Sequence, residues 1–313
     1  MKDILYLLLA GGRGQRLMPL TANTPKPLVR FGTQGSIIDY TLYNCLISGG
    51  GDVLVLTQYL SGMIDTYINT HWITAFSNKG RKLKAISSQE LGSNFYKGTA
   101  DAVFQVLSSL NKVPDFVVVL AGDHVYRMDY RQMIAFHLSS NNPATVGCIQ
   151  CDPSQAHHFG IPNIDDDEFI TDFIEKPNNP EFFESRETLM ASMGIYIFDT
   201  HVLMEYLTEN QQENSHDFGH DIIPRMVKQC EVKAFHYRGD NNSIPYWRDV
   251  GDLLAYWKAQ AELIESDIDL LNFSPVKDIG QIPLSKRELV WKNIGANNND
   301  IHPSIADTAL IAV

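Results

Sequence analysis

The residues best suited to chemistry lie close together near the N-terminus. An apolar run over residues 4–9 leads into Ala-Gly-Gly, which is followed by Arg13, Arg16 and, between two prolines, Lys26. Glycine allows main-chain N–H groups to approach a ligand closely, and the three cations would pair with phosphate oxygens. This composition favours a polyphosphate site over the ordinary alternative, a tight turn with solvated arginines. The stretch is not a P-loop, because no Gly-Lys-Ser/Thr opens a helix, and it lacks the Gly-x-Gly-x-x-Gly dinucleotide spacing.

An alternation of apolar strands and amphipathic helices must position this stretch. We expect strands at residues 4–9, 53–57, 83–88, 116–121, 144–149, 192–198 and 232–237. We expect helices at residues 37–48, 99–110, 129–138, 202–207 and 253–264, the second of them capped by Thr99. Continuously apolar strands that alternate with helices indicate an α/β fold: a Rossmann-like, mostly parallel sheet with helices on both faces.

Asp123 lies at the edge of that sheet where ligands are expected. It follows the strand at 116–121 directly after Gly122, and ligands of α/β sheets bind outside the carboxyl ends of the strands. The glycine stretch should reach the same edge. From its position alone, however, Asp123 could equally be a turn or helix-cap aspartate. Residues 159–164 and 168–174 should form a hairpin, with the three aspartates between them as a solvated turn rather than a metal cluster.

The composition argues against several classes of protein. The formal net charge of −12 is unsuited to a nucleic-acid surface. Because no apolar run could span a bilayer and no signal-peptide pattern opens the chain, we expect a cytoplasmic protein without a membrane partner. Four cysteines in 313 residues are too few for a disulfide framework. Cys148-x-x-Cys151 has no second pair and favours reduced, structural thiols over zinc.

Seven segments, in order along residues 1–265, resemble the sugar-1-phosphate nucleotidyltransferases. The resemblance is greatest to the bacterial ADP-glucose pyrophosphorylases, also called glucose-1-phosphate adenylyltransferases. The segments are Leu-Ala-Gly-Gly-Arg-Gly-x-Arg-Leu with its following Lys-Pro, Tyr-Lys-Gly-Thr-Ala-Asp-Ala at 96–102, Leu-Ala-Gly-Asp-His-Val-Tyr at 120–126, Phe-Ile-Glu-Lys-Pro at 173–177, Ala-Ser-Met-Gly-Ile-Tyr at 191–196, Asp-Phe-Gly at 217–219 and Tyr-Trp-Arg-Asp-Val-Gly at 246–251.

The resemblance implies a nucleotidyltransferase (GT-A-like) domain and a specific reaction. The chain would transfer AMP from ATP to α-D-glucose 1-phosphate, giving ADP-glucose and pyrophosphate for glycogen biosynthesis, with Mg²⁺ as cofactor. A phosphate monoester is already largely ionised at neutral pH, so no general base is needed. Positioning and charge stabilisation would then supply the rate.

The resemblance also implies roles for individual residues. Asp123 and Asp249 would hold the metal, and Arg16 and Lys26 would act with them in catalysis. The nucleotide would contact Leu9, Ala10, Gly11, Gly12, Arg13, Gln89 and Gly98. Glucose 1-phosphate would contact Tyr96, Gly160, Glu175, Lys176, Ser192, Tyr196, Asp217, Phe218 and Trp247. Gln58 and Phe95 match positions that couple effector sites to the active site. Taken singly, Glu175-Lys176 could be a surface pair and the aromatic residues could belong to the core.

The chain departs from this family near its C-terminus. We expect a catalytic domain at residues 1–270 and, at 271–313, a linker and the start of a truncated β-helix domain in which no six-residue repeat can be counted. The family's β-helix is thus essentially absent, which leaves its tetramer and allosteric control open here, although a homo-oligomer is possible. Three alternatives also stay open: a related enzyme that uses UTP or dTTP, a non-catalytic regulatory subunit of the same fold, and a poorly stable fragment.

Overall fold

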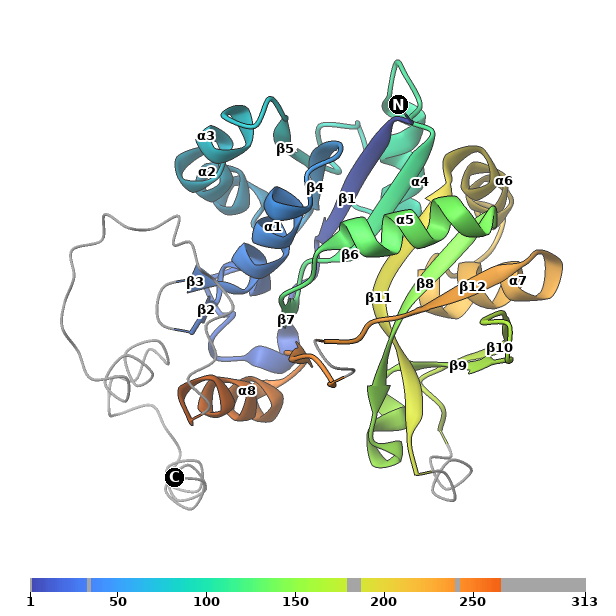
Figure 1. The fold of residues 1–313 in the computed structure, drawn as a ribbon. Helices are drawn as coiled ribbons and strands as arrows, with labels where there is room; N and C mark the ends of the chain where they lie inside the picture. Colours follow the sequence, from blue (N-terminus) through green and yellow to red (C-terminus); the bar gives the residue numbers. More distant parts are fainter. Residues whose placement is uncertain (1, 33–34, 179–186, 240–242, 266–313) are drawn as a thin grey trace.

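A seven-stranded sheet forms the centre of the protein (Figure 1). The computed structural model describes residues 2–32, 35–178, 187–239 and 243–265. Across the sheet the strands lie in the order β12 (Val232–His236), β8 (Ala144–Cys151), β11 (Leu189–Asp199), β6 (Phe116–Ala121), β1 (Ile4–Ala10), β4 (Asp52–Thr57) and β5 (Leu83–Ser87). Only β11 runs antiparallel to its neighbours, so the expected mostly parallel sheet is confirmed.

Helices cover both faces of the sheet, as the apolar strands require. The helices whose buried side chains join one core are α4 (Thr99–Ser109), α6 (Thr200–Asn210) and α7 (Ile223–Gln229). Those on the other core are α1 (Ile37–Ser48), α2 (Ser61–His71), α3 (Ile73–Ser77) and α5 (Tyr130–Ser140). The last described helix, α8 (Leu253–Glu265), packs against a third, smaller cluster. Among the described residues, each helix is too short or too polar to cross a bilayer.

Smaller elements add the edges of the site. Two-stranded sheets pair β9 (Gly160–Ile164) with β10 (Ile170–Glu175), β7 (His124–Tyr126) with β13 (Trp247–Asp249), and β2 (Arg30–Phe31) with β3 (Gly35–Ser36). The short helices are η1 (Gln15–Leu17), η2 (Lys26–Leu28), η3 (Pro153–His158) and η5 (Phe218–Ile222). The first of these pairs confirms the hairpin expected there. The β7–β13 pair was not expected.

One sequence expectation about helix ends is wrong. Gly98, not Thr99, occupies the N-cap of α4, and no side chain caps the helix. Thr99 is instead the first helical residue, and its hydroxyl donates a hydrogen bond to Asp217 Oδ2 at 3.0 Å. The hydroxyl therefore joins α4 to a distant loop instead of stabilising its own helix. The expected boundary at residue 270 and the expected linker at 271–313 lie outside the described residues.

Asp39 is a buried carboxylate that ties three helices together. It is fully buried on α1 and accepts hydrogen bonds from the Ser36 backbone N–H, the Tyr67 hydroxyl and the Trp72 indole N–H, each at 2.7 Å. Tyr67 belongs to α2, and Trp72 stands between α2 and α3. Removal of this carboxylate would leave three donors without their acceptor.

We predict that Asp39→Ala lowers the free energy of unfolding by about 3 kcal/mol or more, because unsatisfied buried donors each carry a desolvation cost. Urea denaturation followed by circular dichroism measures this. Asp65→Ala, which removes an exposed carboxylate from α2, is the control and should change stability little. A loss below about 1 kcal/mol in Asp39→Ala would contradict this role.

Candidate active site

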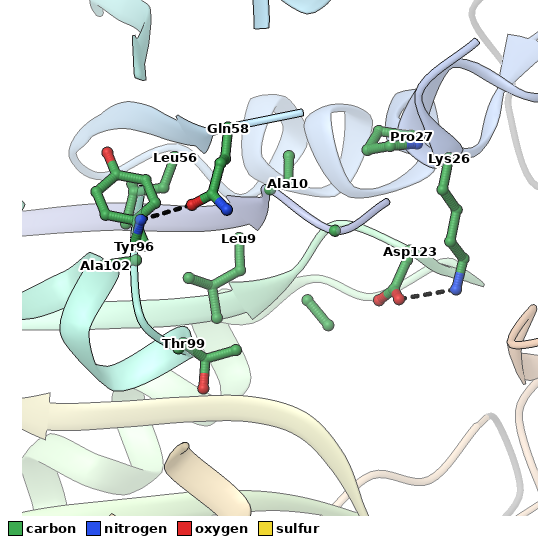
Figure 2. Close-up of a pocket in the computed structure, with 14 residues that line it drawn as sticks. Leu9, Ala10, Lys26, Pro27, Leu56, Gln58, Tyr96, Thr99, Ala102 and Asp123 are labelled. Carbon is green, nitrogen blue, oxygen red and sulfur yellow. Dashed lines mark hydrogen bonds and ion pairs between the residues drawn. The ribbon is translucent and has the colours of Figure 1, made fainter. Parts of the chain in front are cut away.

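A cavity of ≈ 340 Å³ lies at the carboxyl-terminal edge of the sheet (Figure 2). It is bounded by the ends of β1, β4 and β6 and by the first turn of α4. Its walls contain five of the seven residues expected to bind nucleotide, together with Lys26, Tyr96 and Asp123. The full lining is Leu9, Ala10, Gly11, Gly12, Lys26, Pro27, Leu56, Gln58, Tyr96, Gly98, Thr99, Ala102, Ala121 and Asp123. The predicted meeting of the glycine stretch with Asp123 is therefore observed.

Two glycines of the lining differ in what surrounds them. A Cβ on Gly98 would lie 2.2 Å from the carbonyl oxygen of His216, so the chain can pass here only without a side chain. A Cβ on Gly12 would meet no protein atom within 4 Å, and its φ angle is not in the left-handed region. The fold itself therefore does not require glycine at residue 12, which leaves approach of a ligand to the main chain as a reason for it.

Two distant carboxylates converge at one end of the cavity. Antiparallel pairing of β7 with β13 sets Asp249 opposite His124, the residue that follows Asp123. Lys26 Nζ lies 2.8 Å from Asp123 Oδ2 and 4.0 Å from Asp249 Oδ1. His124 Nε2 lies 3.6 Å from Asp123 Oδ1 and 3.8 Å from Asp249 Oδ1. A three-residue strand pair thus delivers the second acid to the first, and Figure 2 shows Lys26 pointing at Asp123.

The charge on Asp123 is stabilised by its neighbours. Burial alone would raise the pKa of this carboxyl, but interaction with Lys26 and then His124 lowers the pKa well below its usual range. The group is therefore anionic at neutral pH. The described residues contain no cluster of three or more His, Cys, Asp or Glu side chains arranged to hold a metal. Because Mg²⁺ is commonly bound by one or two carboxylates with phosphates and water completing its shell, Asp123 and Asp249 fit that ion.

The two arginines of the N-terminal stretch occupy different surroundings. A Cβ on Gly251 would lie 3.5 Å from Arg16 Nη2 and 3.4 Å from Asp249 Oδ2, so Arg16 is near the acid pair. The Arg13 guanidinium instead lies over the Tyr59 ring, 5.7 Å from its centroid. Neither arginine lines the cavity, and both are exposed.

A second cluster contains six of the nine residues expected around glucose 1-phosphate. Glu175 is central: a Cβ on Gly160 or Gly219 would lie 2.8 or 2.4 Å from its Oε2, so both glycines make room for the carboxylate. Burial raises the pKa of Glu175, while Lys176 Nζ, at 3.2 Å from Oε1, opposes that shift. The other members of the cluster are Ser192, Tyr196 and Phe218, where the last two rings stack with centroids 5.7 Å apart and Ser192 Oγ donates to Tyr196 Oη at 3.5 Å.

The other three residues expected at the sugar site either lie outside this cluster or already make hydrogen bonds within the protein. Asp217 caps η5 by accepting hydrogen bonds from the N–H groups of Gly219 and His220, and it also accepts from Thr99. Through Thr99 this residue connects the second cluster to the cavity. Tyr96 belongs to the cavity wall, and Trp247 packs edge-on against His124 beside the acid pair.

Of three further residues from the sequence analysis, Gln58 lines the cavity and Gln89 and Phe95 do not. Gln58 lines it and accepts a hydrogen bond from the Tyr96 N–H at 2.6 Å (Figure 2). Gln89 is exposed in the turn after β5, where its carbonyl accepts from Gly92. Phe95 is exposed and does not line the cavity. The cavity-facing glutamine is therefore Gln58, for which sequence reasoning gave only a coupling role.

His124 is a site residue that sequence reasoning missed. Its Nδ1 lies 3.0 Å from the Met193 carbonyl, which can only accept, so Nδ1 carries the proton and Nε2 faces the two acids. Gly194, at φ +65°, sits within a register shift of β11 and leaves space for the ring. The only sequence signal was its place directly after Asp123.

We predict that Gly12→Ala retains the wild-type melting temperature but weakens binding of ATP, used here as a polyphosphate probe, by at least ~10-fold, because the added methyl is free of protein contacts yet blocks close approach to the main chain. Isothermal titration calorimetry with Mg²⁺ and thermal melts measure the two effects. Gly62→Ala, whose Cβ also meets nothing within 4 Å, is the matched control. Equal ATP affinity in both variants would argue against main-chain binding at this loop.

Comparison with known proteins agrees with this architecture. Residues 5–266 match the family described as nucleotidyl transferase. Among the similar proteins are a glucose-1-phosphate adenylyltransferase of Paraburkholderia phytofirmans, 43% identical over 273 residues, and one of Rhodopirellula baltica, 39% identical over 277 residues. The matched segments cover 84% and 86% of this chain but only 65% and 62% of those relatives, so the chain spans less than two thirds of their length. The extent of the family match establishes that the chain belongs to the nucleotidyl transferase family.

Proposed function

We propose that the chain transfers AMP from ATP to α-D-glucose 1-phosphate, forming ADP-glucose and pyrophosphate for glycogen biosynthesis. The observation that carries the proposal is the meeting of Asp123, Asp249 and Lys26 at the end of a glycine-lined cavity. The similar proteins named glucose-1-phosphate adenylyltransferase support the choice of substrates. A regulatory subunit without catalysis would have no need to retain this arrangement.

The residues would act mainly by neutralising and orienting anions. An ionised sugar phosphate attacks the α-phosphorus of ATP without a general base, and the obstacle is repulsion between the two anions. Lys26 and Arg16 would offset the charge on the phosphates and on the departing pyrophosphate. Mg²⁺ held by Asp123 and Asp249 would supply further charge neutralisation and alignment of the phosphates.

The second cluster suits the sugar phosphate. The Glu175 carboxylate can accept hydrogen bonds from sugar hydroxyls, and the Lys176 ammonium can pair with the phosphate. The stacked Tyr196 and Phe218 rings offer an apolar wall for a pyranose. In this proposal Asp217 acts by holding η5 beside Glu175.

The base would lie at the other end of the cavity, near the main chain of Leu9–Gly11. Gln58 Oε1 is already bonded to the Tyr96 N–H, so its amide NH₂ is the group available to a ligand. We assign base contact to this end of the cavity, with Gln89 as an outer contributor. Turnover compared among ATP, UTP, dTTP and GTP tests the choice, and a preference for UTP or dTTP would redirect the proposal to a related enzyme.

The proposal extends to the whole chain in four respects. We infer that residues 1–270 form the catalytic domain and that residues 271–313 belong to a linker and the start of a β-helix domain. We infer a cytoplasmic setting, where ATP and sugar phosphates are available. A homo-oligomer and effector coupling through Gln58 and Phe95 are part of the same hypothesis, and analytical ultracentrifugation and effector titrations test them.

We predict that wild-type protein releases pyrophosphate from ATP plus glucose 1-phosphate only with a divalent cation. Asp123→Asn and Asp249→Asn should each lower turnover by about 10²-fold or more, because each loses charge at the metal site. Asp65→Asn, an exposed change on α2, is the control. Near-normal turnover in a folded Asp123→Asn or Asp249→Asn variant would remove that residue from the mechanism.

We predict that Gly219→Ala raises KM for glucose 1-phosphate by at least ~10-fold, because its Cβ would displace the Glu175 carboxylate that lies 2.4 Å away. KM for ATP should change far less. Gly62→Ala again serves as control. A rise confined to the KM for ATP would show that Glu175 does not serve the sugar phosphate.

A further inference from the structure

The Lys26 side chain is largely buried, and neighbouring residues restrict it on several sides. Its side chain is only 8% exposed, whereas the side chains of Asp123 and Asp249 are 40% and 25% exposed. The stem packs against Gly14, where a Cβ would lie 2.8 Å from the Lys26 Cβ, and Gly14 has a φ of +63°. Pro25 and Pro27 restrict the backbone on either side. The ammonium is therefore directed at the two acids by the surrounding chain.

One ammonium thus faces both of the carboxylates that fit a divalent ion. The 2.8 Å contact with Asp123 is a direct ion pair, and the 4.0 Å separation from Asp249 is within ion-pair range. His124 Nε2 also lies between the acids, but at 3.6 and 3.8 Å it is farther from both than Lys26 is from Asp123. Among the described residues, the shortest charged contact with these two acids is therefore made by Lys26.

We infer that Lys26 is a built-in counter-ion of the metal site, which opposes binding of a free divalent cation and moves to the phosphates when nucleotide and metal bind together. The inference rests on the proposed function, because it identifies the phosphates of ATP as the group that draws the ammonium away. It gives Lys26 a second role, in making metal binding depend on nucleotide.

Thermodynamic linkage gives this arrangement a definite consequence. If phosphates attract the ammonium away from Asp123, they raise the affinity of the acids for the metal, and the metal must raise nucleotide affinity by the same factor. Metal alone would bind weakly because two positive groups compete for the same oxygens. If Lys26 merely positioned the acids for the metal, its removal would weaken metal binding instead. Removal of the Lys26 ammonium would therefore raise metal affinity if Lys26 is a counter-ion and lower it if Lys26 positions the acids.

Titration with Mn²⁺ alone, followed by electron paramagnetic resonance of the free ion, separates them. We predict that Lys26→Met binds Mn²⁺ at least ~10-fold more tightly than wild type, because a competing charge is lost. The gain should vanish in Lys26→Met combined with Asp123→Asn. Lys112→Met, which removes the partner of Asp3 in an exposed ion pair, is the matched control and should bind Mn²⁺ as wild type does. Unchanged or weaker Mn²⁺ binding in Lys26→Met overturns the inference.

A second measurement uses wild-type protein and does not depend on the folding of any variant. Reductive methylation read by mass spectrometry reports how accessible each lysine amine is. Saturating Mg²⁺ alone should increase labelling of Lys26 at least ~2-fold relative to Lys112, whose partner Asp3 belongs to an exposed pair away from the site. If Lys26 labelling does not rise, the ammonium does not leave the acids and the inference fails.

Failure of the counter-ion role and failure of the proposed reaction would give different results. ATP with Mg²⁺ should protect Lys26 from methylation, and ADP-glucose should form when glucose 1-phosphate is added. If no ADP-glucose forms while Mn²⁺ still binds more tightly to Lys26→Met, the proposed substrates are wrong, but the counter-ion role of Lys26 still holds. If ADP-glucose forms but Lys26→Met does not bind Mn²⁺ more tightly, only the inference that Lys26 is a counter-ion is wrong.

Discussion

The repulsion between two carboxylates is the constraint on which the rest of the site depends. Asp123 and Asp249 come from distant parts of the chain, and their placement at one point is unfavourable unless cations accompany them. The Lys26 ammonium, 2.8 Å from Asp123 and 4.0 Å from Asp249, is such a cation. The same arrangement suits a reaction between two anions, because both tasks require positive charge fixed at one edge of a sheet.

The fold concentrates these groups by ending its strands together. Parallel strands bring the glycine stretch after β1 and Asp123 after β6 to one edge, and the β7–β13 pair adds Asp249 there. The antiparallel strand β11 contributes differently: its register shift and Gly194 turn the Met193 carbonyl toward His124. The hydrogen bond from Thr99 to Asp217 then connects the cavity to the Glu175 cluster. The two regions that we propose for the substrates are thereby joined by protein contacts on the α4 side of the sheet.

Much of the sheet and its helices could be predicted from the sequence. Continuous apolar runs identified β1 and β6, and the helix expected at residues 37–48 is α1, because long elements carry periodic signals that local burial enforces. The antiparallel direction of β11 was not predictable, since its apolar pattern is the same in either direction. The β7–β13 pair has three residues per strand, which is too few to show the alternation of apolar and polar residues that identifies a strand. Thr99 and His124 were misjudged because their partners, Asp217 and Met193, are remote in sequence.

The reverse reaction tests the central claim most directly. The protein would be incubated with ADP-glucose, pyrophosphate and Mg²⁺, and ³¹P NMR would follow the products. The account predicts that ATP and glucose 1-phosphate appear together in equal amounts, and that neither appears when the divalent cation is chelated. Failure to form ATP under these conditions, or consumption of UDP-glucose in preference to ADP-glucose, would contradict it.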